Sequence, residues 1–146
     1  MPLIRNQSGT LLRMSKPQVV SKPRFLRLDA RPSSAREARE FLRANAKHLH
    51  LAAEQVALGQ LAVSELVTNA VLHGRGPISV RAARGRSGVR VEVGDNSPQT
   101  PRMGAPSDED SGAHGLPIVA AVAREWGGDG EADETGKRVW FTVPAA

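Results

Sequence analysis

The sequence predicts an α+β domain, a two-layer sandwich in which helices cover one face of a mostly antiparallel sheet. Two segments with helical apolar spacing follow one another between residues 33 and 73. Alternating apolar segments then come in pairs joined by short turns, at 78–94 and at 127–143. Because helices and strands are grouped rather than strictly alternating, hairpins of an antiparallel sheet are favoured over a parallel sheet.

The excess positive charge lies in the first part of the chain. The formal net charge is +5, yet the first 28 residues carry six Lys and Arg and no acidic residue, so the remainder is close to neutral. Residues 1–22 also mix Pro, Ser and Gln without apolar period, which predicts a disordered or loosely attached basic tail before a domain at 23–146. Since the charge belongs to a tail and not to a face of the domain, we expect no direct contact with nucleic acid.

The first half of the domain is predicted as one strand and two helices. The strand covers 24–30, with Leu26 and Leu28 on one face. A helix follows from Ser33 or Ser34 as N-cap, with Glu37 in its first turn, to about residue 48. The second helix covers 53–73 and is ended by the Gly-Arg-Gly-Pro segment at 74–77.

The second half is predicted as two hairpins separated by a loop and a helix. Strands are expected at 78–84 and 88–94 with a Gly-rich turn between them. A polar loop at 95–114 is long for a compact domain, which is typical of a functional or mobile segment. A third helix is expected at about 115–126, followed by strands near 127–133 and 137–143.

Three polar residues share one stripe of the second helix. Glu65, Asn69 and His73 follow one another at a spacing of four residues, with apolar neighbours on the flank. An isolated Glu and Asn at this spacing lie more often on a solvated helix face. A carboxylate and an amide at the edge of a core are costly unless something uses them, so the apolar flank favours a binding site.

Two further segments carry weaker signals. Asp95 ends an apolar strand, where it either accepts a hydrogen bond from the amine of a ligand or starts a turn. The glycines of the segment SGAHGL at 111–116 precede a predicted helix, whose free N–H groups are able to hold phosphate. The chain has no Walker A sequence, so this is not a P-loop.

Taken in order, these motifs resemble those of the anti-sigma factor serine/threonine kinases, a branch of the GHKL or histidine-kinase-like ATPase superfamily. The segment SELVTNAVLHG at 64–74 resembles the N box of that family, and Asp95 matches the adenine-reading Asp of the first glycine box. Residues 112–119 are similar to the second glycine box, and 136–141 to the final strand. The resemblance covers about residues 24–143 and implies a GHKL-type ATP-binding fold.

The resemblance implies ATP and Mg²⁺ as cofactors and a role for each matching residue. Asn69 would coordinate Mg²⁺, Glu65 would be the catalytic general base, and Asp95 would bind the adenine amine. The other residues of the implied nucleotide site are His73, Gly112, His114, Gly115 and Leu116. The segment at 96–114 would be a mobile lid over the triphosphate.

The implied function is that of an anti-sigma factor that phosphorylates an anti-anti-sigma partner of the STAS type and binds a sigma factor. The chain departs from the family where glycines usually follow the adenine-reading Asp, because residues 95–99 read Asp-Asn-Ser-Pro-Gln. A nucleotide-gated protein-binding module without kinase activity is therefore the alternative. The family also admits a homodimer.

The sequence indicates a cytoplasmic protein without membrane contact. The chain has no cysteine, so disulfides and thiolate metal sites are excluded. The first twenty residues lack the continuous apolar stretch of a secretory signal, and we expect no apolar run of membrane-spanning length.

Overall fold

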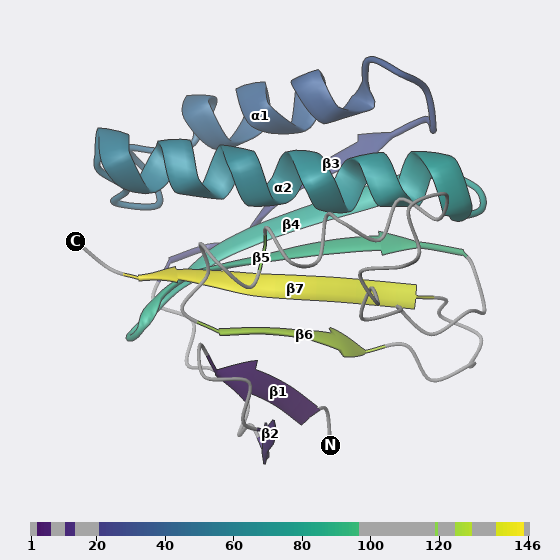
Figure 1. Cartoon of the computed structure of the whole chain (residues 1–146). Helices are drawn as coiled ribbons and strands as arrows, with labels where there is room; N and C mark the ends of the chain where they lie inside the picture. The colour runs from purple at the N-terminus through teal and green to yellow at the C-terminus, as the bar shows by residue number, and fades with distance from the viewer. Residues whose placement is uncertain are drawn as a thin grey trace.

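Two helices lie together on one side of an antiparallel sheet (Figure 1). The computed structural model describes residues 3–6, 11–13, 21–96, 119, 125–129 and 137–144. In chain order the elements are β1 (Leu3–Asn6), β2 (Leu11–Arg13), β3 (Arg24–Leu28), α1 (Ser34–Ala44), α2 (Ala53–His73), β4 (Ile78–Gly85), β5 (Gly88–Asp95), β6 (Glu125–Asp129) and β7 (Lys137–Pro144). The strands form one sheet in the order β2-β1-β6-β7-β5-β4-β3. The predicted α+β sandwich is confirmed.

The core lies between the helices and the face of the sheet that they cover. Every neighbouring pair of strands is antiparallel, so alternate residues of each strand point to this face. The buried residues that β4, β5 and β7 contribute are Ile78, Val80, Ala82, Val89, Val91, Val93, Val139, Phe141 and Val143. This regular alternation is the signal that made the two hairpins predictable.

The long helix α2 packs on two sides, against the sheet and against α1. Its buried residues are Gly59, Ala62, Val63, Leu66, Val67 and Ala70. By length and composition α2 would also pass for a membrane-spanning helix, where the sequence led us to expect no apolar run of that length. Packing against two neighbours accounts for this apolar character, and the absence of membrane contact stays a prediction.

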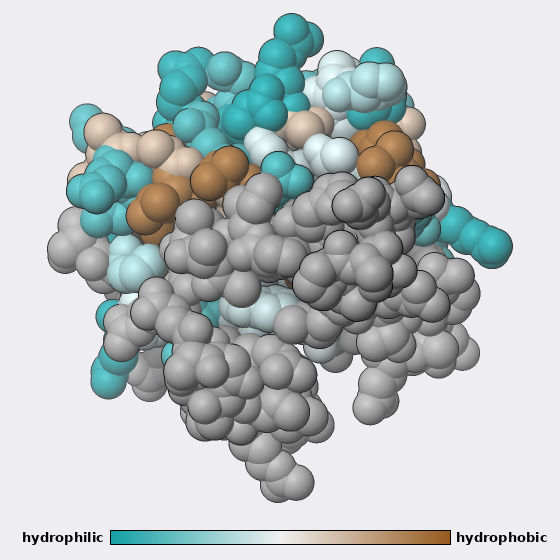
Figure 2. All heavy atoms as spheres, viewed as in Figure 1, coloured by the Kyte–Doolittle hydropathy of each residue, from teal (hydrophilic) through white to brown (hydrophobic). Residues whose placement is uncertain are grey.

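The outer helix α1 presents a hydrophilic surface. In Figure 2 hydrophilic side chains dominate the region of α1, and hydrophobic ones appear in the band of α2 below it. Leu61 and Leu72 of α2 belong to the exposed large hydrophobic residues. The two helices therefore differ in the surface that they offer, and α2 carries the more apolar one.

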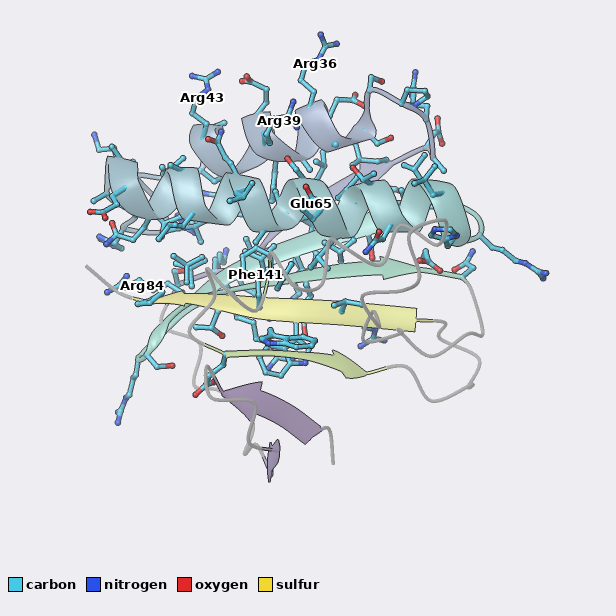
Figure 3. All side chains as sticks on the ribbon, in the orientation of Figure 1. Arg36, Arg39, Arg43, Glu65, Arg84 and Phe141 are labelled. Carbon is cyan, nitrogen blue, oxygen red and sulfur yellow. The ribbon has the colours of Figure 1, made fainter. Side chains whose placement is uncertain are left out.

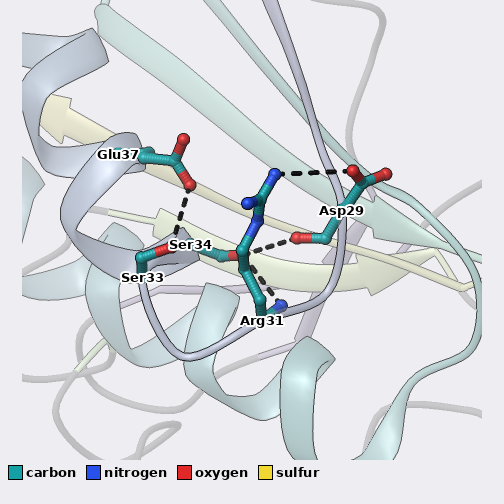
Figure 4. Close-up of polar contacts among 5 residues, drawn as sticks. All are labelled: Asp29, Arg31, Ser33, Ser34 and Glu37. Carbon is teal, nitrogen blue, oxygen red and sulfur yellow. Dashed lines mark hydrogen bonds and ion pairs between the residues drawn. The ribbon is translucent and has the colours of Figure 1, made fainter.

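The loop before α1 is held by a buried serine (Figure 4). The hydroxyl of Ser34 donates to the carbonyl of Asp29 at 2.6 Å and accepts from the N–H of Arg31 at 3.1 Å. Ser33 occupies the N-cap position, but its side chain makes no capping hydrogen bond. Of the two N-cap candidates in the sequence, Ser33 has the position and Ser34 makes the structural hydrogen bonds.

Two predicted helix ends are wrong. The first helix ends at Ala44 rather than near residue 48, because the Asn45 side chain donates to the carbonyl of Phe41 at 2.8 Å and starts a series of turns. The third helix was expected to reach 126, but Glu125 and Trp126 pair with β7 in β6, and the Trp126 side chain is buried in the core. Strand pairing and burial of the indole outweigh continuation of the helix.

The other predicted elements agree closely with the structure. The helix at 53–73 is confirmed residue for residue, and the strands at 78–84, 88–94 and 137–143 are each found within one residue. The first strand ends at Leu28, two residues early, because Asp29 takes part in the Ser34 loop. Of the third helix, Val119 is described, and it is helical and buried.

Strands also form within the segment predicted as a tail. β1 and β2 pair with each other, and Arg5 and Asn6 of β1 pair with β6. Without β1, the edge of β6 would present unpaired N–H and C=O groups, and an added strand satisfies them. These two segments thus have regular structure where the composition predicted none, while the boundary between tail and domain stays a prediction.

The face of the sheet opposite the helices carries a network of charged and aromatic side chains. Glu92 of β5 pairs with Arg81 at 3.3 Å and with Arg90 at 3.1 Å. The guanidinium of Arg90 lies 4.1 Å from the ring centroid of Trp140 on β7. The core that the helices share with the sheet lies on the other face, where the candidate site also lies.

Candidate functional site

The polar stripe of α2 lies where the buried face of the helix meets its exposed face. Glu65 and Asn69 are half-buried, and His73 is exposed at the last helical residue. Their neighbours Leu66 and Ala70 are buried in the core. The predicted position of the stripe at the edge of the core is confirmed.

Neither Glu65 nor Asn69 uses its side chain to hold the fold together. Within the described residues, neither side chain makes a hydrogen bond or an ion pair. The neighbouring residue Ser64 behaves differently, since its hydroxyl accepts from the Arg39 guanidinium of α1 at 2.8 Å. Figure 3 shows Glu65 on α2 beneath Arg39, on the side of the helix that faces the viewer. Among the described residues, the carboxylate and the amide therefore have no competing hydrogen-bond partner.

Asp95 ends β5 on the face that the helices cover. It continues the alternation of Val91 and Val93, so its side chain points to the same side of the sheet, and 5% of the residue is exposed. A buried carboxylate is costly, and the C-terminal end of α2 beside it carries the negative end of the helix dipole.

The end of α2 and the end of β5 are in direct contact. A Cβ atom on Gly74 would lie 2.5 Å from the Asp95 carboxylate oxygen Oδ2. The N–H of Asn96 donates to the carbonyl of Arg75 at 2.8 Å, which ties the residue after β5 to the residue after Gly74. The N–H of Gly74 donates to the carbonyl of Ala70 and closes the last turn of α2. Through its contact with Gly74, Asp95 therefore lies against the helical turn that directly follows Asn69.

The donor atoms of this region suit a magnesium–nucleotide complex. Mg²⁺ prefers oxygen ligands and takes one or two of them from the protein, with phosphates and water completing its shell. Asn69 supplies an amide oxygen of this kind, and Glu65 lies one helical turn away on α2, where its carboxylate is placed to accept a proton. In the described part of the chain no three His, Cys, Asp or Glu residues form a metal cluster. A carboxylate such as that of Asp95 is an acceptor for the exocyclic amine of adenine.

The other half of the expected site lies outside the described residues. This applies to Gly112, His114, Gly115 and Leu116, and to residues 97–114 of the expected lid. Asn96, which was expected to begin the lid, is held by Arg75 instead.

The two glycines after α2 make contacts with the end of β5 that the sequence pattern does not predict. The sequence pattern marks Gly76 only as part of the segment that ends the helix, and Gly74 as part of that segment and of the N box resemblance. In the structure they also face Asp95 and Asn96, since Cβ atoms on them would lie 2.5 Å from Asp95 Oδ2 and 2.6 Å from Asn96 Nδ2. Two glycines within three residues of a polar stripe were the available signal, but glycines that end helices are common.

A comparison with known protein families covers the part of the chain that contains the site. A family model described as a histidine kinase-like ATPase domain matches residues 28–143. No curated protein matches the chain. The matched range runs from the end of β3 almost to the end of β7, and it includes both Glu65 and Asp95.

Proposed function

Because the chain belongs to the histidine kinase-like ATPase domain family, we propose that it binds ATP with Mg²⁺ between the stripe of α2 and the end of β5. We propose further that it uses this nucleotide as an anti-sigma factor with serine/threonine kinase activity. Its substrate would be an anti-anti-sigma partner of the STAS type, and its regulatory target a sigma factor.

One observation carries the proposal: two half-buried polar side chains of α2 make no hydrogen bond or ion pair among the described residues, and the end of that helix contacts a buried carboxylate at the end of β5. Glu65 and Asn69 have no partner among the described residues, and Asp95 is buried at the negative end of α2. A ligand that brings a metal ion gives Glu65 and Asn69 a use, and the amine of that ligand is a donor for the Asp95 carboxylate.

The proposed roles follow from the chemistry of each side chain. The Asn69 amide oxygen would hold Mg²⁺, which neutralises the charge of the phosphates when bound. The Asp95 carboxylate would accept the exocyclic amine of adenine and so orient the nucleotide along α2. Towards the phosphates, the proposed contacts are His73, Gly112, His114, Gly115 and Leu116.

Glu65 would act as the general base of the transfer. Its carboxylate is half-buried and has no ion-pair partner in the described residues, so it is able to accept the proton of an approaching serine or threonine hydroxyl. Positioning and metal charge supply the remainder of phosphoryl transfer, so no covalent intermediate with the protein is needed. Nucleotide binding without phosphoryl transfer does not require this carboxylate.

A binding module gated by ATP, without kinase activity, is the second candidate. The observation that favours it is the segment after Asp95, where residues 96–99 contain no glycine. Such a module would sequester its protein partner in one nucleotide state and release it in the other. It would need Asn69 and Asp95 but not Glu65.

Mass spectrometry of the partner distinguishes the two candidates. The protein is incubated with MgATP and a STAS-type partner, and the intact mass of the partner is followed with time. A kinase adds one phosphate to a serine or threonine, and the Glu65→Gln variant serves as the matched control. A partner of unchanged mass that nevertheless binds in a nucleotide-dependent way identifies the module instead.

A further inference from the structure

The backbone conformation at position 74 does not require glycine. The φ of Gly74 is −87° and its ψ is −174°, values that other residues adopt without strain. Its N–H donates to the carbonyl of Ala70 at 2.9 Å and closes α2. Since any residue except proline is able to make this bond, the reason for glycine lies in the space around it.

That space is filled by Asp95. A Cβ atom on Gly74 would lie 2.5 Å from Oδ2 and 2.7 Å from Cγ of Asp95, and 2.5 Å from the carbonyl oxygen of Ala70. Carbon atoms need about 3.5 Å to their neighbours. The Ala70 carbonyl is fixed by the helix, and the backbone of Asp95 is fixed by pairing with Lys137 of β7. Rotation of the Asp95 carboxylate relieves the contact with Oδ2 and Cγ, whereas relief of the contact with the Ala70 carbonyl requires a shift of residue 74 itself.

A second glycine of the segment after α2 makes a similar contact with the residue that follows β5. Gly76 has a positive φ of 71°, and a Cβ atom on it would lie 2.6 Å from Nδ2 of Asn96. Between the two glycines the carbonyl of Arg75 accepts from the N–H of Asn96. The turn after α2 thus holds two successive residues of the strand end, with a backbone hydrogen bond between the two side-chain contacts.

We propose that Gly74 is the specificity-determining positioning residue for Asp95. By presenting bare backbone to the carboxylate, it fixes the direction in which Oδ1 and Oδ2 point, and so sets the acceptor that selects adenine over purines without an exocyclic amine. This rests on the proposed nucleotide function. Gly74 itself touches the carboxylate and not the nucleotide.

The expected size of the effect follows from the worth of one hydrogen bond to a charged group. Loss of such a bond corresponds to roughly tenfold in affinity or more. A displaced carboxylate loses this bond with ATP but loses nothing with purine riboside triphosphate, which has no amine at the same position. Gly74→Ala therefore lowers the affinity ratio of the two nucleotides rather than only the stability of the protein.

Calorimetric titration of the whole chain with each nucleotide and Mg²⁺ measures this ratio. Wild type is expected to prefer ATP by roughly tenfold or more, and Asp95→Ala to show no preference. Gly74→Ala is expected to fall to within about threefold of the Asp95→Ala ratio, by the same reasoning. Gly59→Ala is the matched control, because Gly59 is a buried glycine of α2 whose Cβ would meet Leu42 and Val143, not the site; it is expected to keep the wild-type ratio.

The possible outcomes separate the two proposals. A folded Gly74→Ala variant with the wild-type ratio overturns the role of Gly74 and leaves ATP binding intact. A wild type that binds neither nucleotide overturns the proposed function and this inference with it. A wild type that binds both nucleotides equally contradicts the reading of adenine by Asp95, and therefore contradicts this inference as well.

If Gly74→Ala fails to fold, the double variant Gly74→Ala/Asp95→Ala still tests the proposal. Removal of the carboxylate in Gly74→Ala/Asp95→Ala relieves the contact with Asp95 but not the contact with the Ala70 carbonyl. Recovery of a cooperative melt in the double variant supports the proposal. Failure of both variants to fold shows that the helix carbonyl is what requires glycine, and overturns it.

Discussion

At the residue scale, Asn69 is the side chain on which the proposed magnesium binding depends most. The structure gives Asn69 no other task, since its amide makes no hydrogen bond among the described residues. Asn69→Ala is expected to abolish measurable MgATP binding in calorimetry while the melting temperature without ligand stays close to that of wild type. Thr68→Ala, which changes an exposed neighbour on the same helix, is the control and should bind normally. Equal affinity for MgATP in wild type and Asn69→Ala would remove Asn69 from the site.

Substitution of Glu65 is expected to separate nucleotide binding from phosphoryl transfer. Glu65→Gln keeps the shape and removes the base, so it is expected to retain nucleotide but to phosphorylate a partner at least roughly a hundredfold more slowly. Single-turnover transfer of phosphate, measured at saturating MgATP, gives the rate directly. Transfer at the wild-type rate would show that Glu65 is not the base, even if nucleotide binding is confirmed.

Residue types and spacing predicted one half of the described site and not the other. The interval of four between Glu65, Asn69 and His73 is sufficient to place them on one helical stripe, because the helix period is fixed. The contact between Gly74 and Asp95 has no such local signal. It depends on how α2 crosses the end of β5, which packing of the whole domain decides.

At the scale of elements, the two serines before α1 are distinguished by what their hydroxyls bind. Ser34→Ala removes two hydrogen bonds in a buried position, from Arg31 and to Asp29. It is expected to lower the free energy of unfolding by about 1–2 kcal/mol. Ser33→Ala removes one long contact of 3.5 Å to Glu37 and should cost less than about 0.5 kcal/mol.

Denaturant unfolding of the two variants side by side measures the difference. A larger loss in Ser33→Ala than in Ser34→Ala would mean that capping by position outweighs the loop hydrogen bonds. This comparison is independent of nucleotide, so it tests the description of the fold by itself.

Strand and helix positions were predictable wherever periodicity and stop signals agreed. The helix at Ala53–His73 ends at a glycine, and apolar residues recur at every second position of β4 from Ile78 and of β5 from Val89, so their bounds follow from local sequence. At Trp126 the local pattern is ambiguous, because a short apolar segment fits either a helix end or a strand. Pairing of β6 with β7, more than ten residues away, decides it.

At the scale of the whole molecule, the described residues of the expected site, on α2 and at the end of β5, lie on the helix-covered side of the sheet. The opposite face is occupied by the network around Arg90, Glu92 and Trp140. The extra strands β1 and β2 extend the sheet at the β6 edge, on the far side of β7 from Asp95. A ligand between α2 and β5 would therefore contact the domain where helix and sheet layers meet, and its binding would stabilise both.

The melting temperature with and without MgATP tests this account most directly, because a ligand that binds only the folded state must raise it. At a ligand concentration of about one hundred times Kd the added stability is about 2.7 kcal/mol, which corresponds to roughly 5 °C or more for a domain of this size. We expect that rise for wild type, and none for Asn69→Ala. An unchanged melting temperature of wild type in saturating MgATP, or an equal rise in Asn69→Ala, would contradict the proposed site.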